Sequence, residues 1–330
     1  MNKTKVKIAS VASYLPEKIL SNADLEEIVD TSDEWIQTRT GMKERRISDE
    51  NTPSSELAFN AINKLFDKTN IKKKDIDLII VATVTPDHPF PSTACILQHK
   101  LGLNTIPAFD ISAGCTGFIY ATSIAKQFIE NGNANNAIVV GVEELSIITN
   151  WEDRSTCVLF GDGAGAALIT KAKGGETSEI IDTYISADGK YGDLLIQEAG
   201  GSKMPACQKS IDENLHTIYM EGNKIFKNAV KAMGHSAVKI LKDNGLTGED
   251  VDWFIPHQAN MRIIASTANK AKIKPNKVIT NIEKYGNTSA ASIPIAFAEA
   301  IDDGKIKRGD VVILDAFGAG LTWGSVLLRY

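Results

Sequence analysis

A single thiol, Cys115, stands between small residues in a setting that suits a nucleophile. Residues 106–111 predict a short strand, and apolar residues at helical spacing predict a helix over 118–131. Cys115 would then lie at a helix start, where unpaired backbone N–H groups and the helix dipole favour the thiolate. Gly114 and Gly117 leave room for a substrate carbonyl beside an N–H donor. The same pattern also fits a small buried cysteine, so other residues must decide between the two interpretations.

Two polar side chains elsewhere are candidates to act with this cysteine. His257 follows the apolar residues Ile255 and Pro256, and Asn287 follows Gly286. Taken alone, such a histidine is typical of a buried, hydrogen-bonded side chain, and such an asparagine is typical of a turn or helix cap. The remaining histidines have no comparable neighbours, and we expect structural or surface roles for them: His88, His99, His216 and His235.

An internal repeat links these candidates. Residues 102–140 and 272–313 each predict a strand, a turn with small residues, a helix and a strand of Val and Ile. Residues 75–82 and 250–255 both predict an apolar strand that is opened by acidic residues. The chain therefore resembles a duplicated α/β unit, and two halves are also what a length of 330 residues favours.

The repeat predicts one catalytic group. Aligning 282–289 with 110–117 without a gap puts Asn287 opposite Cys115, and the strand alignment puts His257 just beyond a strand end. Ligands of open α/β sheets bind beyond the carboxyl ends of strands. We therefore expect Cys115, His257 and Asn287 to meet in one site.

Composition excludes several classes of function. The net charge is −5 and the pI is near 5.7, and no Lys/Arg tract resembles a nucleic-acid-binding arm. The four cysteines are scattered, without a CxxC pair or a Cys/His cluster at metal-ligand spacing, which suits a reducing compartment. No apolar signal core precedes the strand predicted over 5–14, and no apolar run is long enough to cross a bilayer. We expect a soluble cytoplasmic protein with no metal, no nucleic-acid partner and no membrane insertion.

Two further segments have alternative interpretations. The polar segment 31–46 fits a solvated helix end, or a clamp in which Trp35 stacks on an aromatic ligand and Arg39 pairs with its phosphate. The glycines of 160–165 could suggest a dinucleotide loop, but Ala166 replaces the third fingerprint glycine and the expected acidic partner is missing. Tight turns and close packing explain these glycines better.

With these residues in hand, the whole chain resembles the β-ketoacyl-acyl carrier protein synthase III family of thiolase-like condensing enzymes, which initiate fatty acid synthesis. The resemblance rests on these segments: Asp33–Gly41, Phe90–Ser92, the Cys115 turn, Arg154–Gly165, Met220–Asn223, Pro256–Asn260, Tyr285–Ser289 and Thr322–Gly324. It implies a five-layered αβαβα fold of two similar halves, 1–172 with the nucleophile and 173–330 with the catalytic His and Asn. It also implies a homodimer without a cofactor, whose substrates are acyl-CoA and malonyl-acyl carrier protein.

The resemblance further implies a mechanism. Cys115 would take the acyl group from a short acyl-CoA, with the backbone N–H groups of Cys115 and Ala319 as the oxyanion hole. His257 and Asn287 would then stabilise the enolate that forms as malonyl-acyl carrier protein loses carbon dioxide. One departure is Gly318-Ala319-Gly320, where the family often has three glycines; Ala319 would be strained if its position required positive φ.

Binding residues are implied in the same way. For CoA these are Trp35 and Arg154 around the adenine, Arg39 near the phosphates, and Asn260. For the acyl carrier protein they are the segment Gln258, Ala259, Asn260, Met261 and Arg262, in which Arg262 supplies a cation for an acidic partner. Phe90 matches the residue that reaches into the acyl pocket of the partner subunit.

Other functions on this fold remain alternatives. One is a related acyltransferase of a specialised pathway that makes an ester or amide, or a hydroxymethylglutaryl-CoA synthase. Another is a non-catalytic partner subunit, which the intact Cys115, His257 and Asn287 argue against. A papain-like protease has the same residue types in the same order, but its cysteine-rich oxidising signature is absent. The sequence does not determine the length or branching of the acyl primer.

Overall fold

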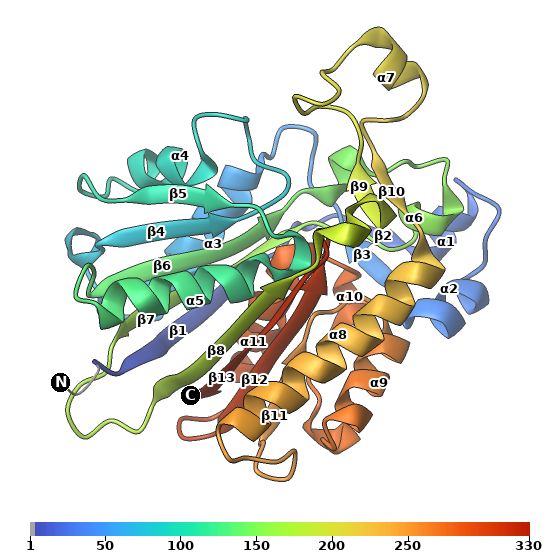
Figure 1. Ribbon diagram of the computed structural model, residues 1–330. Coiled ribbons are helices and arrows are strands. Elements are labelled where there is room, and N and C mark those ends of the chain that lie inside the picture. The colour runs from blue at the N-terminus through green and yellow to red at the C-terminus, as the bar shows by residue number, and fades with distance from the viewer. Residues whose placement is uncertain (1–3) are drawn as a thin grey trace.

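A computed structural model describes residues 4–330 of the protein (Figure 1). A five-stranded sheet forms its first half. The strands lie in the order β1-β7-β6-β4-β5. Their bounds are β1 Val6–Tyr14, β4 Leu78–Ala82, β5 Ala108–Ile111, β6 Asn136–Glu143 and β7 Gly163–Lys171. β4 is parallel to β5 and β6, whereas β7 is antiparallel to β6 and β1. β4 is apolar and buried along its whole length, as expected of a central strand covered on both faces.

A four-stranded sheet in the second half has the order β11-β12-β13-β8. Its strands are β8 Glu179–Ala187, β11 Trp253–Pro256, β12 Val311–Gly318 and β13 Thr322–Arg329. β11 is parallel to β12, and β13 is antiparallel to β12 and β8. This order and these directions match those of β4-β6-β7-β1, so the expected duplication of an α/β unit is confirmed.

Helices form three layers around the two sheets. α5 (Gly117–Glu130) and α11 (Ser292–Asp302) contact strands of both sheets and lie between them. The first sheet is covered on its outer face by α3 (Ser54–Asp67) and α4 (Thr93–Lys100), and the second by α8 (Gly222–Asp243) with α9 (Met261–Lys270) beside it (Figure 1). The result is the five-layered αβαβα arrangement of thiolase-like enzymes that the sequence predicts.

Shorter elements surround these layers. The two small sheets pair β2 (Ile19–Ser21) with β3 (Glu44–Arg46), and β9 (Leu195–Gln197) with β10 (Ile218–Met220). The remaining α-helices are α1 Asn22–Glu26, α2 Asp33–Thr40, α6 Arg154–Cys157, α7 Gln208–Asp212 and α10 Ile282–Tyr285. α7 lies in the excursion between β9 and β10 that protrudes at the top of Figure 1. None of the helices within residues 4–330 has both the length and the apolar character needed to span a bilayer.

The two halves repeat with a constant spacing. Leu78 of β4 pairs with Ala137, and Trp253 of β11 pairs with Val312, so both residues of the second pair lie 175 positions after those of the first. The same spacing separates two short 3-10 turns, Gly114–Thr116 before α5 and Ser289–Ala291 before α11. Matching turns and strands therefore bring the starts of α5 and α11 to equivalent places.

This spacing corrects the gapless alignment expected from the sequence. Gly114 and Ser289 occupy equivalent positions and share a left-handed backbone, with φ of 52° and 46°. Cys115 is therefore equivalent to Ala290, and Asn287 lies three residues earlier than predicted. The match of Gly286-Asn287 to Gly114-Cys115 was misleading, because the true counterpart of Gly114 is Ser289. Both have a positive φ, but only one of them is a glycine.

Candidate active site

Cys115, His257 and Asn287 line one cavity of about 290 Å³. Cys115 lies in the turn before α5, His257 follows β11 directly, and Asn287 precedes the turn before α11. Cys115 lies more than 140 positions before the other two residues, and His257 and Asn287 follow different elements of the second half. Only the fold brings the three side chains together. The structure therefore brings the three side chains to one cavity, as predicted, but the two halves align in a different register from the one expected.

The environment of Cys115 does not favour a resting thiolate. Burial raises the pKa of the Cys115 thiol to about 12; the nearby Ser289 hydroxyl lowers that pKa, and the nearby Glu143 carboxylate raises it. Placement before a helix therefore does not make this cysteine acidic on its own, which corrects the expectation drawn from the sequence. Its proton must be removed when Cys115 attacks a substrate.

Two backbone N–H groups meet beside the thiol. A Cβ at Gly318 would lie 2.5 Å from the Cys115 nitrogen, and a Cβ at Gly114 would lie 2.7 Å from the Ala319 nitrogen. Both positions therefore need glycine so that the two turns can pack backbone to backbone. Within residues 4–330, no backbone carbonyl accepts a hydrogen bond from either nitrogen, which leaves both as donors for an oxyanion. Ala319 does not have positive φ; Gly320 does, at 133°, so the expected strain at Ala319 is absent.

His257 is buried and neutral. Burial lowers the pKa of its imidazole to about 3. Its Nδ1 lies 2.7 Å from the Ser292 hydroxyl, which also accepts a hydrogen bond from the Gln258 N–H at 3.4 Å. In the tautomer in which the Ser292 hydroxyl donates to Nδ1, the imidazole carries its own proton on Nε2. A neutral histidine in this tautomer is a hydrogen-bond donor to a ligand in the cavity.

Asn287 combines a structural and a chemical capacity. Its Oδ1 accepts the Ser289 N–H at 2.9 Å, while its backbone bonds to Leu159 and Gly161 fix the loop. The side-chain amide is thereby oriented, and its Nδ2 group keeps both protons for the cavity. The turn role and the donor role, which the sequence posed as alternatives, are compatible at this position.

A second, apolar pocket adjoins the cysteine. It measures about 140 Å³ and shares Cys115, Phe160 and Leu195 with the main cavity. Its other apolar side chains are Val84, Leu145, Ile148, Ile196 and Ile218. The sequence did not reveal these residues because they come from four separate segments and carry no motif. Phe90 lines neither space in this chain and is 85% exposed.

Trp35 and two arginines mark the other end of the main cavity. The Arg39 guanidinium lies 4.6 Å from the centre of the Trp35 ring, and that of Arg154 lies 5.0 Å from it. Trp35, Arg39 and Asn260 line the cavity, whereas Arg154 does not, although the adjacent Ser155 does. An adenine between Trp35 and Arg154 would need the Arg154 side chain to move away. Asn260 is already engaged, since it caps α9 and donates to the Arg39 carbonyl at 2.8 Å.

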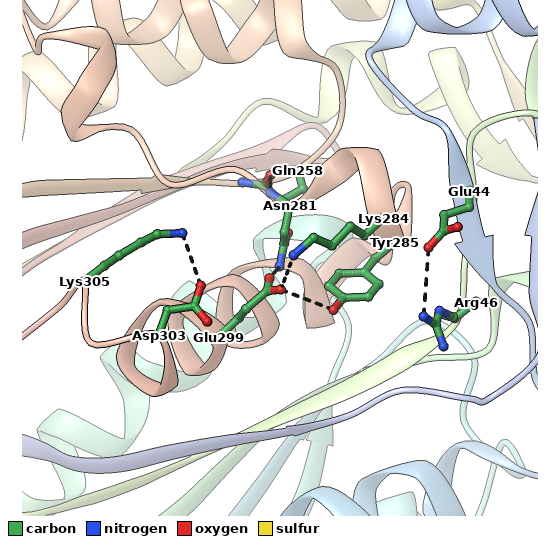
Figure 2. A network of polar contacts seen from close by, with 9 residues as sticks. All are labelled: Glu44, Arg46, Gln258, Asn281, Lys284, Tyr285, Glu299, Asp303 and Lys305. Carbon is green, nitrogen blue, oxygen red and sulfur yellow. Dashed lines mark hydrogen bonds and ion pairs between the residues drawn. The ribbon is translucent and has the colours of Figure 1, made fainter.

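Gln258 is not on the surface, which corrects its expected docking role. Its side chain is 1% exposed, donates to the Pro256 and Ile279 carbonyls, and accepts the Asn281 N–H at 3.0 Å. Figure 2 shows how this contact continues: Asn281 donates to Glu299 of α11, which also pairs with Lys284 at 2.7 Å. Gln258 therefore ties the loop after β11 to the segment that leads into Asn287. Met261 and Arg262 are exposed, as a docking contact requires.

Sequence and structure comparisons along the whole chain identify the same family of proteins. Family models described as "3-Oxoacyl-[acyl-carrier-protein (ACP)] synthase III" and as its C-terminal part match residues 109–189 and 241–330. A beta-ketoacyl-acyl-carrier-protein synthase III of Caldanaerobacter subterraneus subsp. tengcongensis is 54% identical over 98% of this chain and 97% of its own. One of Clostridioides difficile is 48% identical over 99% of both. The crystal structure of a 3-oxoacyl-acyl-carrier-protein synthase III from Aquifex aeolicus, 49% identical, superposes with a TM-score of 0.91 over 98% of this chain and 100% of that one.

Proposed function

This chain belongs to the β-ketoacyl-acyl carrier protein synthase III family, and we propose how its residues divide the work of that enzyme. The protein is an acyltransferase, the condensing enzyme that initiates fatty acid biosynthesis. It joins a short acyl group from acyl-CoA to malonyl-acyl carrier protein with loss of carbon dioxide. The observation that carries the residue assignment is the single cavity lined by Cys115, His257 and Asn287.

In the first half-reaction, Cys115 attacks the acyl-CoA thioester. The carbonyl oxygen accepts hydrogen bonds from the Cys115 and Ala319 N–H groups, which point to no other backbone acceptor within residues 4–330. CoA then leaves, and the acyl chain occupies the apolar pocket of about 140 Å³ beside the sulfur. The small size of this pocket favours a short primer.

In the second half-reaction, His257 and Asn287 act on the malonyl thioester. The Nε2–H of the neutral imidazole and the Nδ2–H of the amide donate to the thioester oxygen as negative charge develops there. The resulting carbon nucleophile attacks the acyl group on Cys115. β-Ketoacyl-carrier protein is released and the thiol is restored.

Decarboxylation should not lose rate as the pH falls from 7 to 5. An imidazole whose pKa is lowered to about 3 stays neutral over this range, whereas one with the ordinary value of 6.5 would become charged. The measurement is carbon dioxide release from malonyl-carrier protein at each pH, with circular dichroism to confirm that the enzyme stays folded. A fall that follows an inflection near 6.5 would show that His257 titrates as an exposed histidine does.

CoA is proposed to enter past Trp35. Arg39 and Arg154 both lie on the indole ring and supply positive charge for the phosphates, and Asn260 holds the Arg39 backbone in place. We propose that Arg154 swings away from the indole so that the adenine can stack between them. Phe90 is proposed to complete the acyl pocket of a second subunit, which its 85% exposure in a single chain supports.

The acyl carrier protein is proposed to dock at the start of α9, through Ala259, Asn260, Met261 and Arg262. Arg262 is exposed, stacks on Phe226 at 5.2 Å and lines the cavity, so it joins the surface to the substrate channel. A carrier protein rich in acidic residues would be attracted to this cation.

Arg262→Glu is expected to raise KM for malonyl-carrier protein about fivefold, the equivalent of about 1 kcal/mol, and to leave Cys115 acylation by acyl-CoA nearly unchanged. Steady-state kinetics with varied carrier protein, at two salt concentrations, measures the first effect, and intact mass measures the second. Lys305→Glu changes the net charge equally at a residue that does not line the cavity, and it should alter neither value. Equal loss of both steps in Arg262→Glu would indicate a structural role.

The proposed function is tested by incubating the enzyme with a panel of acyl-CoA primers. We expect one acyl group per chain, on Cys115 and on none of Cys95, Cys157 or Cys207, and β-ketoacyl product after malonyl-carrier protein is added. An ester or amide product would instead identify an acyltransferase of a specialised pathway. Absence of any acyl-enzyme would support the alternative of a non-catalytic subunit.

Further properties are proposed from the same relationship. We propose a division into halves 1–172 and 173–330, supported by the two repeated sheets, and a homodimer, supported by exposed Phe90 and by β5 at a sheet edge. A cytoplasmic location agrees with four free cysteines. We propose no resident cofactor; within residues 4–330 no group of three His, Cys, Asp or Glu side chains could hold a metal ion.

A further inference from the structure

Glu143 is a buried carboxylate beside the nucleophile that the steps above do not use. It ends β6 and is 0% exposed. Its Oε2 accepts from the Val84 N–H at 3.0 Å, from the Thr85 hydroxyl at 2.9 Å and from the Thr83 hydroxyl at 3.3 Å. Its Oε1 accepts from the Ser289 hydroxyl at 3.1 Å. All four partners within residues 4–330 are uncharged donors, so no cation neutralises this group.

Ser289 connects Glu143 to the sulfur. It lines the apolar pocket together with Cys115, and its hydroxyl is near enough to lower the pKa of that thiol. A hydroxyl has one proton, so it cannot donate to Glu143 and to the sulfur at the same time. In the resting enzyme it donates to Glu143, which leaves its oxygen lone pairs available to accept a proton. Once Glu143 is protonated, the direction of these hydrogen bonds reverses and Ser289 can donate to the sulfur instead.

We propose that Cys115, Ser289 and Glu143 form a proton relay for the acylation step of the proposed function. As the Cys115 Sγ–acyl carbon bond forms, the thiol proton moves to Ser289 Oγ and the Ser289 proton moves to Glu143 Oε1. The bond between the acyl carbon and the CoA sulfur breaks, and the CoA thiolate takes a proton from water. When Cys115 leaves as the condensation product forms, the relay runs in reverse and restores the thiol.

The charges of the site favour this acceptor over His257. Burial raises the pKa of Glu143 to about 7, close to the working pH, where a carboxylate can both accept and return a proton. Burial lowers the pKa of His257 to about 3, and its Nδ1 is already hydrogen-bonded to Ser292 at 2.7 Å. With a thiol pKa raised to about 12, Cys115 needs such an acceptor.

The proposal predicts a pH dependence with a defined sign. The titratable groups around Glu143 are Cys115 from the turn before α5 and Glu144 next to it on the chain, and Glu144 in turn faces Asp87 and Asp162. All are acidic, so none of them holds the pKa of Glu143 down. Because only the ionised carboxylate accepts a proton, the acylation rate should rise with pH through about 7.

The experiment measures single-turnover acylation of Cys115 by acetyl-CoA between pH 5.5 and 9, using quenched samples and intact mass. Wild type should show the rise near pH 7. Glu143→Gln and Ser289→Ala should lose this rise and fall about a hundredfold at pH 8, which is typical of a missing proton acceptor. Glu144→Gln is the matched control: its buried carboxyl also has a pKa near 7 but faces Asp87 and Asp162, so its profile should match wild type.

A second readout separates the relay from simple electrostatics. Glu143→Gln removes a negative charge near the sulfur, so thiolate absorbance should show a more acidic Cys115 even while acylation slows. Variants that acylate with the wild-type profile, or faster in proportion to their thiolate, would overturn the proposal. Carbon dioxide release from malonyl-carrier protein reports that each variant is folded, and Ser289→Ala repeats the test if Glu143→Gln unfolds. Absence of acyl-enzyme in wild type would instead refute the proposed function.

Discussion

Cys115→Ala is expected to form no acyl-enzyme and to lower condensation by at least ~10,000-fold, because Cys115 is the only thiol among the described residues that line the cavity. Malonyl decarboxylation should persist in this variant. Decarboxylation uses the His257 Nε2–H and the Asn287 Nδ2–H as donors. Ser292 orients His257 and the Ser289 backbone orients Asn287, so neither donor depends on the sulfur. Intact mass with acetyl-CoA and carbon dioxide release from malonyl-carrier protein measure the two effects separately.

Cys95→Ala is the matched control, since Cys95 is exposed on α4 and outside the cavity. It should acylate like wild type. Acylation of Cys115→Ala at another cysteine would contradict the assignment of the nucleophile. Loss of decarboxylation together with acylation would show that the sulfur is also needed to hold the malonyl group.

The sequence predicted the fold well where local pattern and tertiary packing agree. The apolar strand β4 and the amphipathic helix α5 follow directly from composition and spacing, and their duplicates at β11 and α11 identify the repeat. The register of that repeat was not predictable from residue identity. It depends on the left-handed backbone at Gly114 and Ser289, and a serine in that conformation gives no signal in a sequence.

The candidate site shows the same division. Cys115 could be singled out from its turn between a predicted strand and helix, and His257 from its place after an apolar strand, whereas Asn287 was selected only by its alignment with Cys115. The state of these groups depends on what surrounds them. Burial, which no motif reports, makes the Cys115 thiol weakly acidic and keeps His257 neutral. Burial also removes Gln258 from the docking surface, although its neighbours in sequence are exposed.

Asn287→Ala is expected to form acyl-enzyme on Cys115 but to lose decarboxylation by about a hundred- to a thousandfold, the usual cost of removing one donor to a developing oxyanion. The loss should be in the second half-reaction alone, because charge accumulates on the malonyl thioester oxygen only as carbon dioxide departs. Acyl-enzyme formation and carbon dioxide release are measured in the same preparation.

Asn287→Asp separates the donor from the turn. The aspartate keeps an oxygen to accept the Ser289 N–H, so the loop is retained, but it has no proton to donate and adds a negative charge next to the enolate. If the Nδ2–H group is what matters, Asn287→Asp should decarboxylate no better than Asn287→Ala while unfolding at a higher temperature. If Asn287→Asp kept wild-type decarboxylation and only Asn287→Ala lost it, the residue would serve the turn before α11, and His257 would be the sole side-chain donor to the enolate.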